Sequence, residues 1–326
     1  SFEAYIIGGA IRDIILKRSV TDFDITTNAT PDDIETLFQQ TLPTGKSFGT
    51  ITVIINKNET QLTTYRSEHT YSNTRHPDHV HYETTIENDL ARRDFTINAL
   101  AYNPLTNQWL DQFNGLADLT NNTLRVIGNP KQRFQEDSLR LFRCCRFASQ
   151  LNFKLTTPTL TSLKALAKTI KLPSKERIHS ELEKCLHANH PQLGLDLLQQ
   201  SGLGERILPG FNTIPKKTIE YCYKIPITIR WAFLLKSIIN SQTFAALSFT
   251  KKEKIWIQSL IKHNLDPKKA SLTIKDLKIT SQTIQNMGFS GKDIGLIQND
   301  LLNQITADIN LNNTEILINI INQKYI

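Results

Sequence analysis

The sequence predicts an α+β protein in which a mixed N-terminal domain is followed by an elongated, all-helical region. Three observations support this class. Up to about residue 107, short β-rich runs alternate with helical ones. From Asn129 onward, almost every segment has the apolar periodicity of a helix, with prolines and glycines between segments. At 326 residues, the chain is also longer than a single core usually allows.

The N-terminal elements can be assigned in chain order. Residues 4–7 predict a strand, Gly8-Gly9 a turn, and residues 10–16 a short helix. Residues 23–26 and 50–55 predict two further strands. A helix is expected to open between them, because Thr30 suits the N-cap and Pro31 the first helical position. We therefore expect a compact domain with a mixed sheet.

Composition indicates an ordinary globular chain, with 21% charged and 39% hydrophobic residues. No run approaches the ~20 apolar residues of a membrane helix, and the N-terminus lacks a signal-peptide pattern, so a cytoplasmic protein is expected. The only methionine is Met287, so the natural chain is expected to begin upstream of Ser1. The four cysteines lack zinc-site spacing and are expected to be buried free thiols.

The net charge of +7 and the pI near 9.1 would concentrate a polyanion such as RNA around the protein. Many basic proteins bind no nucleic acid, so charge alone does not assign the function. The helical half carries lysine-rich stretches at residues 251–254 and 266–269. They are either solvated helix ends or a surface that grips RNA phosphates.

The first chemical motif is Asp22-Phe23-Asp24, which lies in a β-like run. Residues two apart on a strand share a face, so both carboxylates are expected to project together while Phe23 turns into the core. Two converging carboxylates suit Mg²⁺, which commonly shares such ligands with nucleotide phosphates. A solvated surface pair is the alternative interpretation.

The second motif precedes it. Gly8-Gly9 stands between a predicted strand and helix, where bare backbone can approach a triphosphate, and Arg12 could clamp phosphate oxygens. A tight turn explains the glycines equally well. The spacing matches neither the dinucleotide-binding GxGxxG motif nor the phosphate-binding GxxxxGK[ST] motif.

A third motif is Arg92-Arg93-Asp94, in the run Arg92 to Ala99. Two adjacent guanidiniums beside a carboxylate can hold phosphate charge and a ribose hydroxyl together. A surface ion-pair cluster at the start of a helix is the alternative.

The fourth motif lies in a predicted helical run that begins with the cap Asn129-Pro130 and extends to Phe147. Phe134, Leu141, Phe142, Cys145 and Ala148 form its expected buried stripe. Asp137, Arg140, Arg143 and Arg146 recur every three residues and form a polar stripe. Salt bridges on a solvated face are the default explanation of such a stripe.

Together these motifs resemble a known family. Gly8 to Asp13 followed by Asp22-Phe23-Asp24 resembles the first motif of polymerase-β-like nucleotidyltransferases. Arg92 to Ala99 resembles the RRDFT-x-NA signature of class II tRNA nucleotidyltransferases, the CCA-adding enzymes, and of bacterial poly(A) polymerases. Glu136 to Arg140 resembles their EDxxR motif, and the resemblance extends through residues 111–115 and 175–178, covering about residues 5–186.

The resemblance implies a role for each motif. Asp22 and Asp24 would be catalytic metal ligands for two Mg²⁺ ions; Gly9, Arg12 and Arg93 would contact the nucleotide, and Asp94 the ribose. Asp137 and Arg140 would pair with the base of CTP or ATP, since a carboxylate accepts from the amino group that C and A share. Arg143 and Arg146 are expected near the phosphates.

The implied architecture has three parts: a catalytic head at 1–118, a nucleotide-selecting neck at 119–186, and a helical body at 187–326 that binds tRNA. The implied reaction joins CTP and ATP to the 3′ end of tRNA with release of diphosphate. Two departures from the family pattern stand out. Gln61 occupies a position where an acidic residue is expected, and Asn114 replaces the first glycine of a hinge motif.

Alternatives remain at this stage. Complete CCA addition, partial addition and poly(A) synthesis share these motifs, although the polar run from Arg66 to Asp78, expected to be a mobile loop, favours A or CCA addition over CC addition. A noncatalytic RNA-binding relative would not need Asp22 and Asp24. A phosphohydrolase would need histidine ligands, whereas His69, His76, His79 and His81 are expected to be exposed loop residues.

Overall fold

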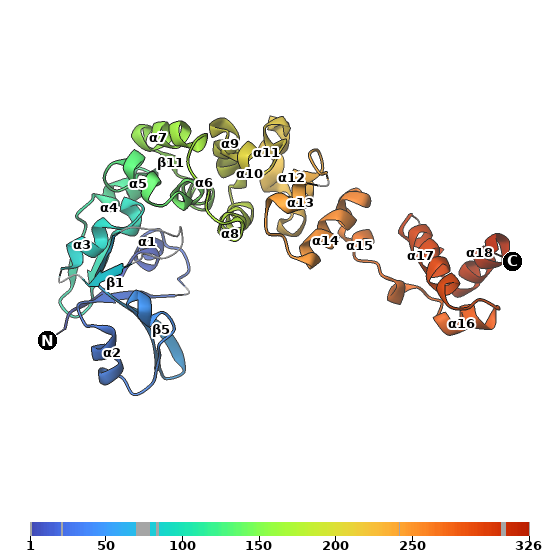
Figure 1. The fold of residues 1–326 in the computed structure, drawn as a ribbon, viewed down its shortest axis with the longest axis horizontal. Helices are drawn as coiled ribbons and strands as arrows, with labels where there is room; N and C mark the ends of the chain where they lie inside the picture. Colours follow the sequence, from blue (N-terminus) through green and yellow to red (C-terminus); the bar gives the residue numbers. More distant parts are fainter. Residues whose placement is uncertain are drawn as a thin grey trace. The chain divides into compact units, whose positions relative to one another are not determined.

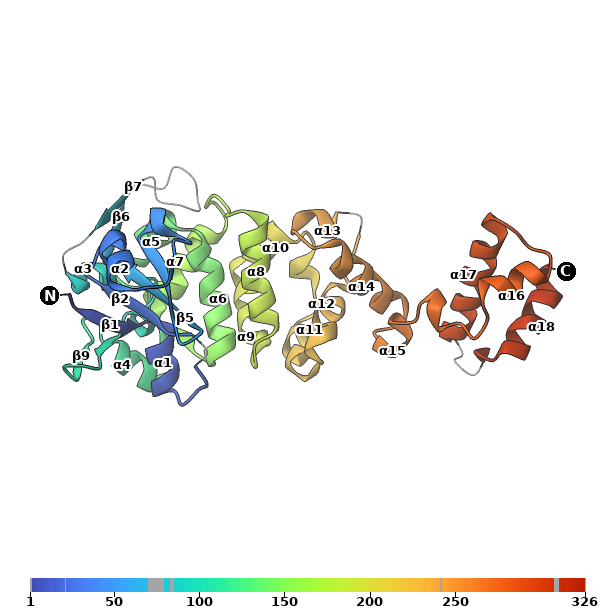
Figure 2. The same ribbon diagram turned by 90° about the horizontal axis from the view of Figure 1, so that it is seen from below.

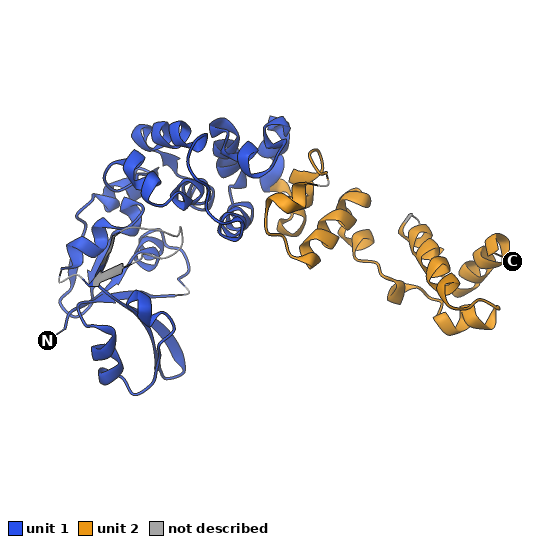
Figure 3. Cartoon of the chain, viewed as in Figure 1, with its two compact units in different colours: residues 1–223 blue, residues 224–326 orange. Residues whose placement is uncertain are grey.

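The computed structural model describes residues 2–20, 22–69, 79–82, 85–240, 242–307 and 311–325. The chain forms two compact units, residues 1–223 and residues 224–326 (Figure 3). The predicted boundaries of head, neck and body at 118 and 186 both fall inside the first unit and stay a prediction.

The first unit begins with a seven-stranded mixed sheet in the order β3-β4-β5-β2-β1-β8-β9. The strands are β1 (Ala4–Ile7), β2 (Asp24–Thr27), β3 (Thr41–Leu42), β4 (Thr50–Ile55), β5 (Asn58–Thr64), β8 (Ala101–Asn103) and β9 (Gln108–Leu110). Strands β2 and β5 run parallel, and the other neighbouring pairs run antiparallel. The predicted mixed sheet is therefore confirmed.

Three helices accompany this sheet: α1 (Gly9–Ile15), α2 (Pro31–Leu37) and α3 (Ile86–Ala91) (Figure 1). Helix α2 begins where the sequence predicts, because Thr30 accepts a hydrogen bond from the Asp33 amide and Asp33 caps Thr30 in return. Its buried Ile34 packs with Ile51 and Val53, which alternate along β4 and therefore share a face. This contact fixes α2 on one side of the sheet.

Two short pairs of strands lie outside the main sheet. Strands β6 (Arg66–His69) and β7 (His79–Tyr82) pair antiparallel, and β10 (Thr123–Leu124) pairs parallel with β11 (Lys154–Leu155). The segment predicted as a loop from Arg66 to Asp78 therefore begins as a strand, which is a correction. Residues 70–78 of that prediction lie outside the described residues.

The rest of the first unit is helical. Its helices are α4 (Gly115–Thr120), α5 (Pro130–Glu136), α6 (Leu139–Leu151), α7 (Thr157–Ala167), α8 (Lys175–Leu186), α9 (Pro191–Ser201), α10 (Leu203–Ile207) and α11 (Lys216–Tyr221). The predicted apolar stripe is confirmed, since Phe134, Leu141, Phe142, Cys145 and Ala148 are all buried. Figure 2 shows α6, α8 and α9 side by side, as their mutual contacts require.

Small and sulfur-containing side chains let these three helices pack closely. Ser149 of α6 accepts a hydrogen bond from the Gly194 amide of α9 and lies 3.2 Å from the Cys185 sulfur of α8. All four cysteines are free and buried, as predicted. Burial raises the pKa of Cys185 to about 12, so this thiol stays protonated at neutral pH and serves packing.

Gly194 is the closest point of this packing and allows a direct test. A Cβ added there would lie 2.5 Å from the Cys185 sulfur, and it would also press on Ser149 and the Cys145 carbonyl. We expect Gly194→Ala to lower the free energy of unfolding by about 2 kcal/mol or more, because backbone atoms cannot yield to the methyl group. Chemical denaturation measures this change.

Gly295 supplies the matched control. It also lies in a helix, α17 (Lys292–Ala307), but an added Cβ would meet nothing within 4 Å. Gly295→Ala is expected to stabilise the chain by up to about 1 kcal/mol through helix propensity. Equal effects of the two substitutions would contradict the close packing of α9 on α6 and α8.

The second unit contains α12 (Arg230–Leu235), α13 (Thr243–Ala246), α14 (Lys251–Lys262), α15 (Pro267–Ala270), α16 (Ser281–Asn286), α17 (Lys292–Ala307) and α18 (Thr314–Tyr325). The last three helices share an apolar cluster that includes Ile284, Leu301 and Leu317. The predicted helical character of this half is confirmed. Among the described residues, none of the helices combines the length and apolar character that crossing a bilayer requires.

Candidate active site

Two adjoining cavities in the first unit, of about 420 Å³ and 630 Å³, collect the residues that the motifs single out. The smaller is lined by Asp24, Gln61, Arg93, Asp94, Asp137, Arg140, Arg143 and Arg177, among others. The larger is lined by Gly9, Arg12, Asp22, Asp24, Arg93, Asp94, Arg143, Arg146 and Lys184, among others. Asp24, Arg93, Asp94 and Arg143 border both. All ten residues predicted for the site therefore face one continuous region.

The two motif carboxylates lie where β2 begins. Asp24 is the first residue of β2 and stands opposite Ile7 of β1. Burial raises the pKa of the Asp24 carboxyl, nearby Arg93 opposes this shift, and Asp22 adds to it. The two carboxylates thus face one region in which an added positive charge would be stabilising.

The prediction that Phe23 turns into the core is wrong, because Phe23 is 44% exposed. The strand starts only at Asp24, so residues 22 and 23 lie ahead of the ladder and strand alternation does not govern them. Both carboxylates still border the larger cavity.

Gln61 of β5 is the direct neighbour of Asp24 in the parallel pair β2–β5. Both residues line the smaller cavity. The register therefore places an amide, rather than a third carboxylate, beside the acidic pair. An amide oxygen can still act as a ligand or hydrogen-bond acceptor, but it brings no negative charge.

The glycine turn ahead of α1 is closely packed. Gly8 has a φ of +70°, a conformation that favours glycine, and an added Cβ would lie 3.0 Å from an Arg93 guanidinium nitrogen. Arg12 donates to Asn98 Oδ1 at 2.6 Å and pairs with Asp13 at 2.8 Å. The guanidinium is thus held in a fixed position at the edge of the larger cavity.

The two arginines after α3 share one buried carboxylate. Asp89 is fully buried, accepts from Arg92 Nε at 2.9 Å, and accepts from Arg93 Nη2 at 3.3 Å. Burial opposes ionisation of Asp89, but the two guanidiniums outweigh it and lower its pKa. This arrangement is unlike the surface ion-pair cluster that the sequence left open, because the shared acid is inside the protein.

Asp94 joins the segment after α3 to α6. It accepts from the Phe95 amide at 2.8 Å, from Asn98 Nδ2 at 3.0 Å and from Arg143 Nε at 2.6 Å. Burial alone would raise the pKa of Asp94, yet Arg143 and these hydrogen bonds hold it at about 2. Asp94 is therefore ionised throughout the physiological range.

The predicted continuous helix from Asn129 to Phe147 is interrupted, which is a correction. Helix α5 starts at the predicted Asn129 cap but ends at Glu136, and α6 starts at Leu139. Asp137 has extended backbone angles, and its Oδ1 accepts from the Leu139 amide at 3.0 Å. Such local side-chain bonding competes with helical bonding. Asp137 thus points into the cavity from a break between helices, instead of belonging to a regular stripe.

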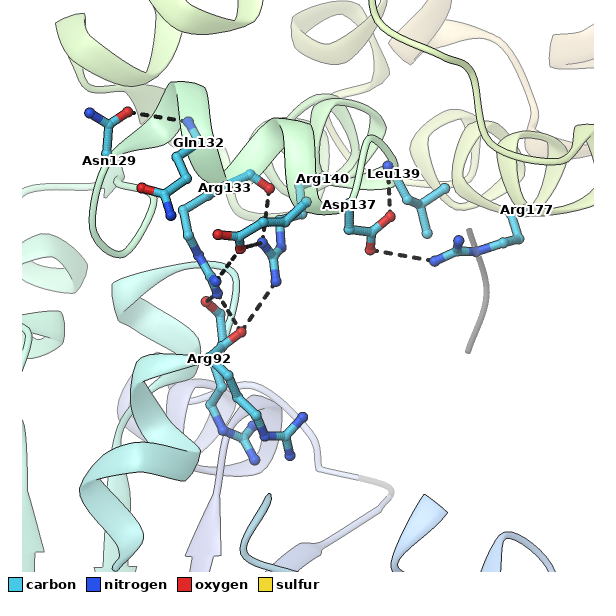
Figure 4. A network of polar contacts seen from close by, with 10 residues as sticks. Arg92, Asn129, Gln132, Arg133, Asp137, Leu139, Arg140 and Arg177 are labelled. Atoms are coloured by element: carbon cyan, nitrogen blue, oxygen red, sulfur yellow. Dashed lines mark hydrogen bonds and ion pairs between the residues drawn. The ribbon is translucent and has the colours of Figure 1, made fainter. Parts of the chain in front are cut away.

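Arg140 bridges the helices and the head (Figure 4). Its guanidinium donates to the Arg133 carbonyl at 2.9 Å and to the Arg92 carbonyl at 3.2 Å, and it lies 3.2 Å from Glu136 Oε2. Arg133 also donates to the Arg92 and Arg93 carbonyls. The arginine expected to read the base is therefore fixed to the backbone of the Arg92-Arg93 motif.

The two later arginines of α6 surround Phe147. The carbon of the Arg146 guanidinium lies 4.0 Å from the ring centroid, and those of Arg12 and Arg143 lie 5.3 Å from it. Arg146 is 2.7 Å from Glu181 of α8. Burial and neighbouring Arg143 lower the pKa of Arg146 to about 10, so it remains cationic at neutral pH. The larger cavity therefore has several fixed positive charges.

Several residues of this region were not predicted from the sequence. Asp89, Asn98 and Arg133 hold predicted site residues in place, and Arg177 and Lys184 line the cavities. Residues 175–178 carried part of the family resemblance, but the pattern assigned Arg177 no role. The side chains of His69, His76, His79 and His81 lie outside the described residues.

Comparison with known proteins gives matches to one family. Residues 4–125 match the poly A polymerase head domain, and residues 152–214 match the probable RNA and SrmB-binding site of polymerase A. The CCA-adding enzyme of Staphylococcus epidermidis is 37% identical over 266 residues, covering 80% of this chain and 64% of the relative. That of Levilactobacillus brevis is 44% identical over 202 residues, covering 62% and 51%.

Solved structures show the same fold. The Bacillus stearothermophilus CCA-adding enzyme in complex with CTP has a TM-score of 0.74 at 24% identity, covering 94% of this chain and 89% of that one. The Thermotoga maritima CCA-adding enzyme complexed with tRNA has a TM-score of 0.64 at 20% identity, covering 99% and 91%.

The mixed sheet and the helices that follow, together with the match of residues 4–125, define a protein of the poly A polymerase-like class. Within that class, the chain belongs to the family of class II tRNA nucleotidyltransferases, or CCA-adding enzymes, and bacterial poly(A) polymerases. It spans 64% and 65% of the length of two curated relatives that it matches.

Proposed function

We propose that this chain is a template-independent nucleotidyltransferase that adds C, C and A to the 3′ end of tRNA from CTP and ATP. The curated relatives that are 36–44% identical carry the name CCA-adding enzyme. The proposal rests mainly on one observation: the acidic pair Asp22 and Asp24 and the polar pair Asp137 and Arg140 line adjoining cavities that share Asp24, Arg93, Asp94 and Arg143. One nucleoside triphosphate can therefore contact both pairs.

The residues fit divalent metal ions. Asp22 and Asp24 offer hard carboxylate oxygens. Burial raises the pKa of Asp24, and the neighbouring Asp22 carboxylate adds to this shift while Arg93 opposes it. Asp22 and Asp24 would hold two Mg²⁺ ions, with the Gln61 amide oxygen next to Asp24. When bound, such ions would lower the pKa of an attacking hydroxyl and stabilise the charge of the five-coordinate transition state.

The positive side chains of the larger cavity would bind the triphosphate. Arg12, Arg93, Arg143 and Arg146 all border it, and their ion pairs and ring contacts fix their positions before a nucleotide arrives. Phosphate oxygens suit the planar guanidinium fork. Gly9 leaves space at the turn, and Asp94 lies where it can accept from a ribose hydroxyl while holding Arg143.

Asp137 and Arg140 would select the base in the smaller cavity. Asp137 Oδ2 can accept from the exocyclic amine of cytosine or adenine, while Arg140 donates to ring acceptors. Uracil and guanine present a carbonyl where the carboxylate needs a donor, so they are disfavoured. Arg140 donates a hydrogen bond to the Arg92 carbonyl. The side chain that would contact the base is therefore held in place by the motif that would bind the phosphates.

Catalysis then depends mainly on holding the RNA 3′-hydroxyl in line with the α-phosphate of the bound nucleotide. The RNA 3′-hydroxyl loses its proton to water, and its oxygen bonds to the α-phosphorus. The bond from this phosphorus to the oxygen that bridges to the β-phosphate breaks, and diphosphate leaves in line with that oxygen. Fixed guanidiniums on the larger cavity stabilise the charge that moves onto diphosphate. The lysine-rich ends of α14 and α15 would contact tRNA phosphates without reading bases. With tRNA as its partner, the protein is expected to act in the cytoplasm.

Sequencing the ends of reaction products tests this function. A tRNA that ends before CCA, incubated with this chain, Mg²⁺, CTP and ATP, is expected to gain C, C and A in order. Runs of A would instead identify a poly(A) polymerase, and C alone or A alone a partial enzyme. RNA binding without any incorporation would contradict catalysis and identify a noncatalytic RNA-binding relative.

A further inference from the structure

One face of the sheet forms the floor of the smaller cavity. Thr50 of β4 lies directly opposite Thr63 of β5. Gln61, two residues earlier on β5, is the direct neighbour of Asp24 of β2. Neighbours across a ladder and residues two apart on a strand share a face, so these four side chains lie together, and all four line the cavity. The nucleotide contacts proposed above leave three of them unused. We call Thr50, Gln61 and Thr63 the polar patch.

The polar patch can donate and accept hydrogen bonds but carries no charge. Thr50 Oγ1 lies 3.1 Å from Thr63 Oγ1. One hydroxyl hydrogen lies between these two oxygens, so the other stays available to a ligand. Gln61 is exposed, and its amide group has both a donor and an acceptor. Neutral groups of this kind suit the hydroxyls of a sugar, whereas a phosphate group is better matched by guanidinium groups.

The direction of attack leads the RNA end to this patch. The attacking oxygen must approach the α-phosphorus from the side opposite to the departing diphosphate. Arg12 and Arg146, which are proposed to hold the phosphates, line the larger cavity and not the smaller, whereas Asp24 borders both. The attacking hydroxyl is therefore expected on the side of Asp24 that faces the smaller cavity. Gln61 is the neighbour of Asp24 on that side.

We infer that the polar patch binds the ribose at the 3′ end of the RNA, with Gln61 and Thr63 bonded to its 2′-hydroxyl and its 3′-hydroxyl directed toward Asp24. The inference rests on the proposed function, because it concerns the second substrate of the same site. The 2′-hydroxyl both donates and accepts, and it is the group that distinguishes RNA from DNA. Arg66, which also lines the smaller cavity, suits the phosphate that joins this ribose to the preceding nucleotide.

The consequence is a preference for ribose at the end of the primer. A primer that ends in 2′-deoxyribose leaves the groups of the polar patch without a partner, and unpaired polar groups at a substrate site weaken transition-state binding. A variant that lacks these groups gains nothing from the 2′-hydroxyl. The change in the protein and the change in the primer are therefore not additive. A purely structural role would lower the rates with both primers together.

The test uses two tRNAs that end before CCA and whose last nucleotide carries either ribose or 2′-deoxyribose. Addition of one C from CTP is measured with each. For the wild-type chain, kcat/KM with the ribose end is expected to exceed that with the deoxyribose end by about tenfold. In Gln61→Leu and in Thr63→Val this ratio is expected to fall to about threefold or less, because only the rate with the ribose end decreases. Thr63→Ser keeps the hydroxyl and is expected to keep the wild-type ratio.

Thr52→Val is the matched control for Thr63→Val. Thr52 lies on the same face of the sheet, directly opposite Gln61 on β4, but it is buried and lines neither cavity. The same substitution is therefore made in the same sheet without touching the polar patch. The ratio between the two primers is expected to stay at the wild-type value.

Three results would overturn the inference. Equal rates with the two primers in the wild-type chain would refute it and leave the proposed function intact. A wild-type ratio in both Gln61→Leu and Thr63→Val would also refute it, and so would equal losses with the two primers. Should Thr63→Val fail to fold by thermal melting, Gln61→Leu decides alone, because Gln61 is exposed. Absence of incorporation by the wild-type chain with either primer would instead overturn the proposed function, and this inference with it.

Discussion

Asp24→Ala is expected to lower kcat/KM for CTP incorporation by at least about 10³-fold, equivalent to ~4 kcal/mol of lost transition-state stabilisation. The reason is that Asp24 borders both cavities and is a predicted ligand of the metal ions that act on the attacking hydroxyl. The fold is expected to survive, because removing a carboxylate whose pKa is raised by burial relieves an unfavourable charge. Primer extension with CTP and thermal melting measure the two effects.

Asp32 provides the control for this experiment. It lies in the same unit, and its side chain is 84% exposed and pairs only with exposed Lys46 among the described ion pairs. Asp32→Ala is expected to extend the primer at the wild-type rate. Normal incorporation by Asp24→Ala, or equal losses in the two variants, would exclude Asp24 from the catalytic centre.

Asp94→Asn is expected to lower the free energy of unfolding by about 2–3 kcal/mol, because it leaves Arg143 largely buried without its counter-ion. Incorporation should fall as well, since Arg143 borders both cavities. Denaturant unfolding at pH 7 measures the stability change. The double variant Asp94→Asn with Arg143→Gln removes both charges and is expected to be more stable than Asp94→Asn alone. A double variant that is less stable than Asp94→Asn would contradict the ion pair between Asp94 and Arg143.

The same pair predicts a pH dependence. The pKa of Asp94 is lowered to about 2 in the folded protein, whereas an unfolded aspartate titrates near 3.9. The stability that this carboxylate contributes is therefore present above about pH 4, and it is lost as the pH falls toward 2. Because Asp94→Asn cannot titrate there, its stability deficit relative to the wild-type chain should shrink across that interval.

Much of the fold follows from local patterns in the sequence. The cap Thr30-Pro31 and the cap Asn129-Pro130 start helices where predicted, because a side-chain acceptor and a fixed φ act on adjacent residues only. The apolar stripe of α6 is likewise local, since burial follows the helical period. The mixed sheet could be anticipated from its strands, but the register that pairs Asp24 with Gln61 needed the structure.

The errors have physical causes that a sequence pattern does not contain. Strand alternation predicts that Phe23 is in the core, but β2 starts one residue later and leaves it exposed. Periodicity predicts a continuous helix through Asp137, but the Asp137 side chain accepts a hydrogen bond from the Leu139 amide where the helix is interrupted.

Contacts between residues that are far apart in the sequence are the other feature that a sequence pattern does not predict. The motifs identified ten of the residues that line the cavities, yet not the contacts that hold them in place. The bond of Arg143 to Asp94 spans 49 residues, and that of Arg177 to Asp137 spans 40. Asp89 lies just ahead of the arginines it binds, but its complete burial depends on the sheet. Tertiary packing therefore decides which of many charged residues meet.

The most direct test of the central claim is a crystal structure of this chain with Mg²⁺ and a non-reactive CTP analogue. We expect the α-phosphate to lie beside Asp22 and Asp24, and the cytosine amino group to lie within hydrogen-bond distance of Asp137 in the same complex. A base bound outside the cavity lined by Asp137 and Arg140, or phosphates bound far from the acidic pair, would contradict it.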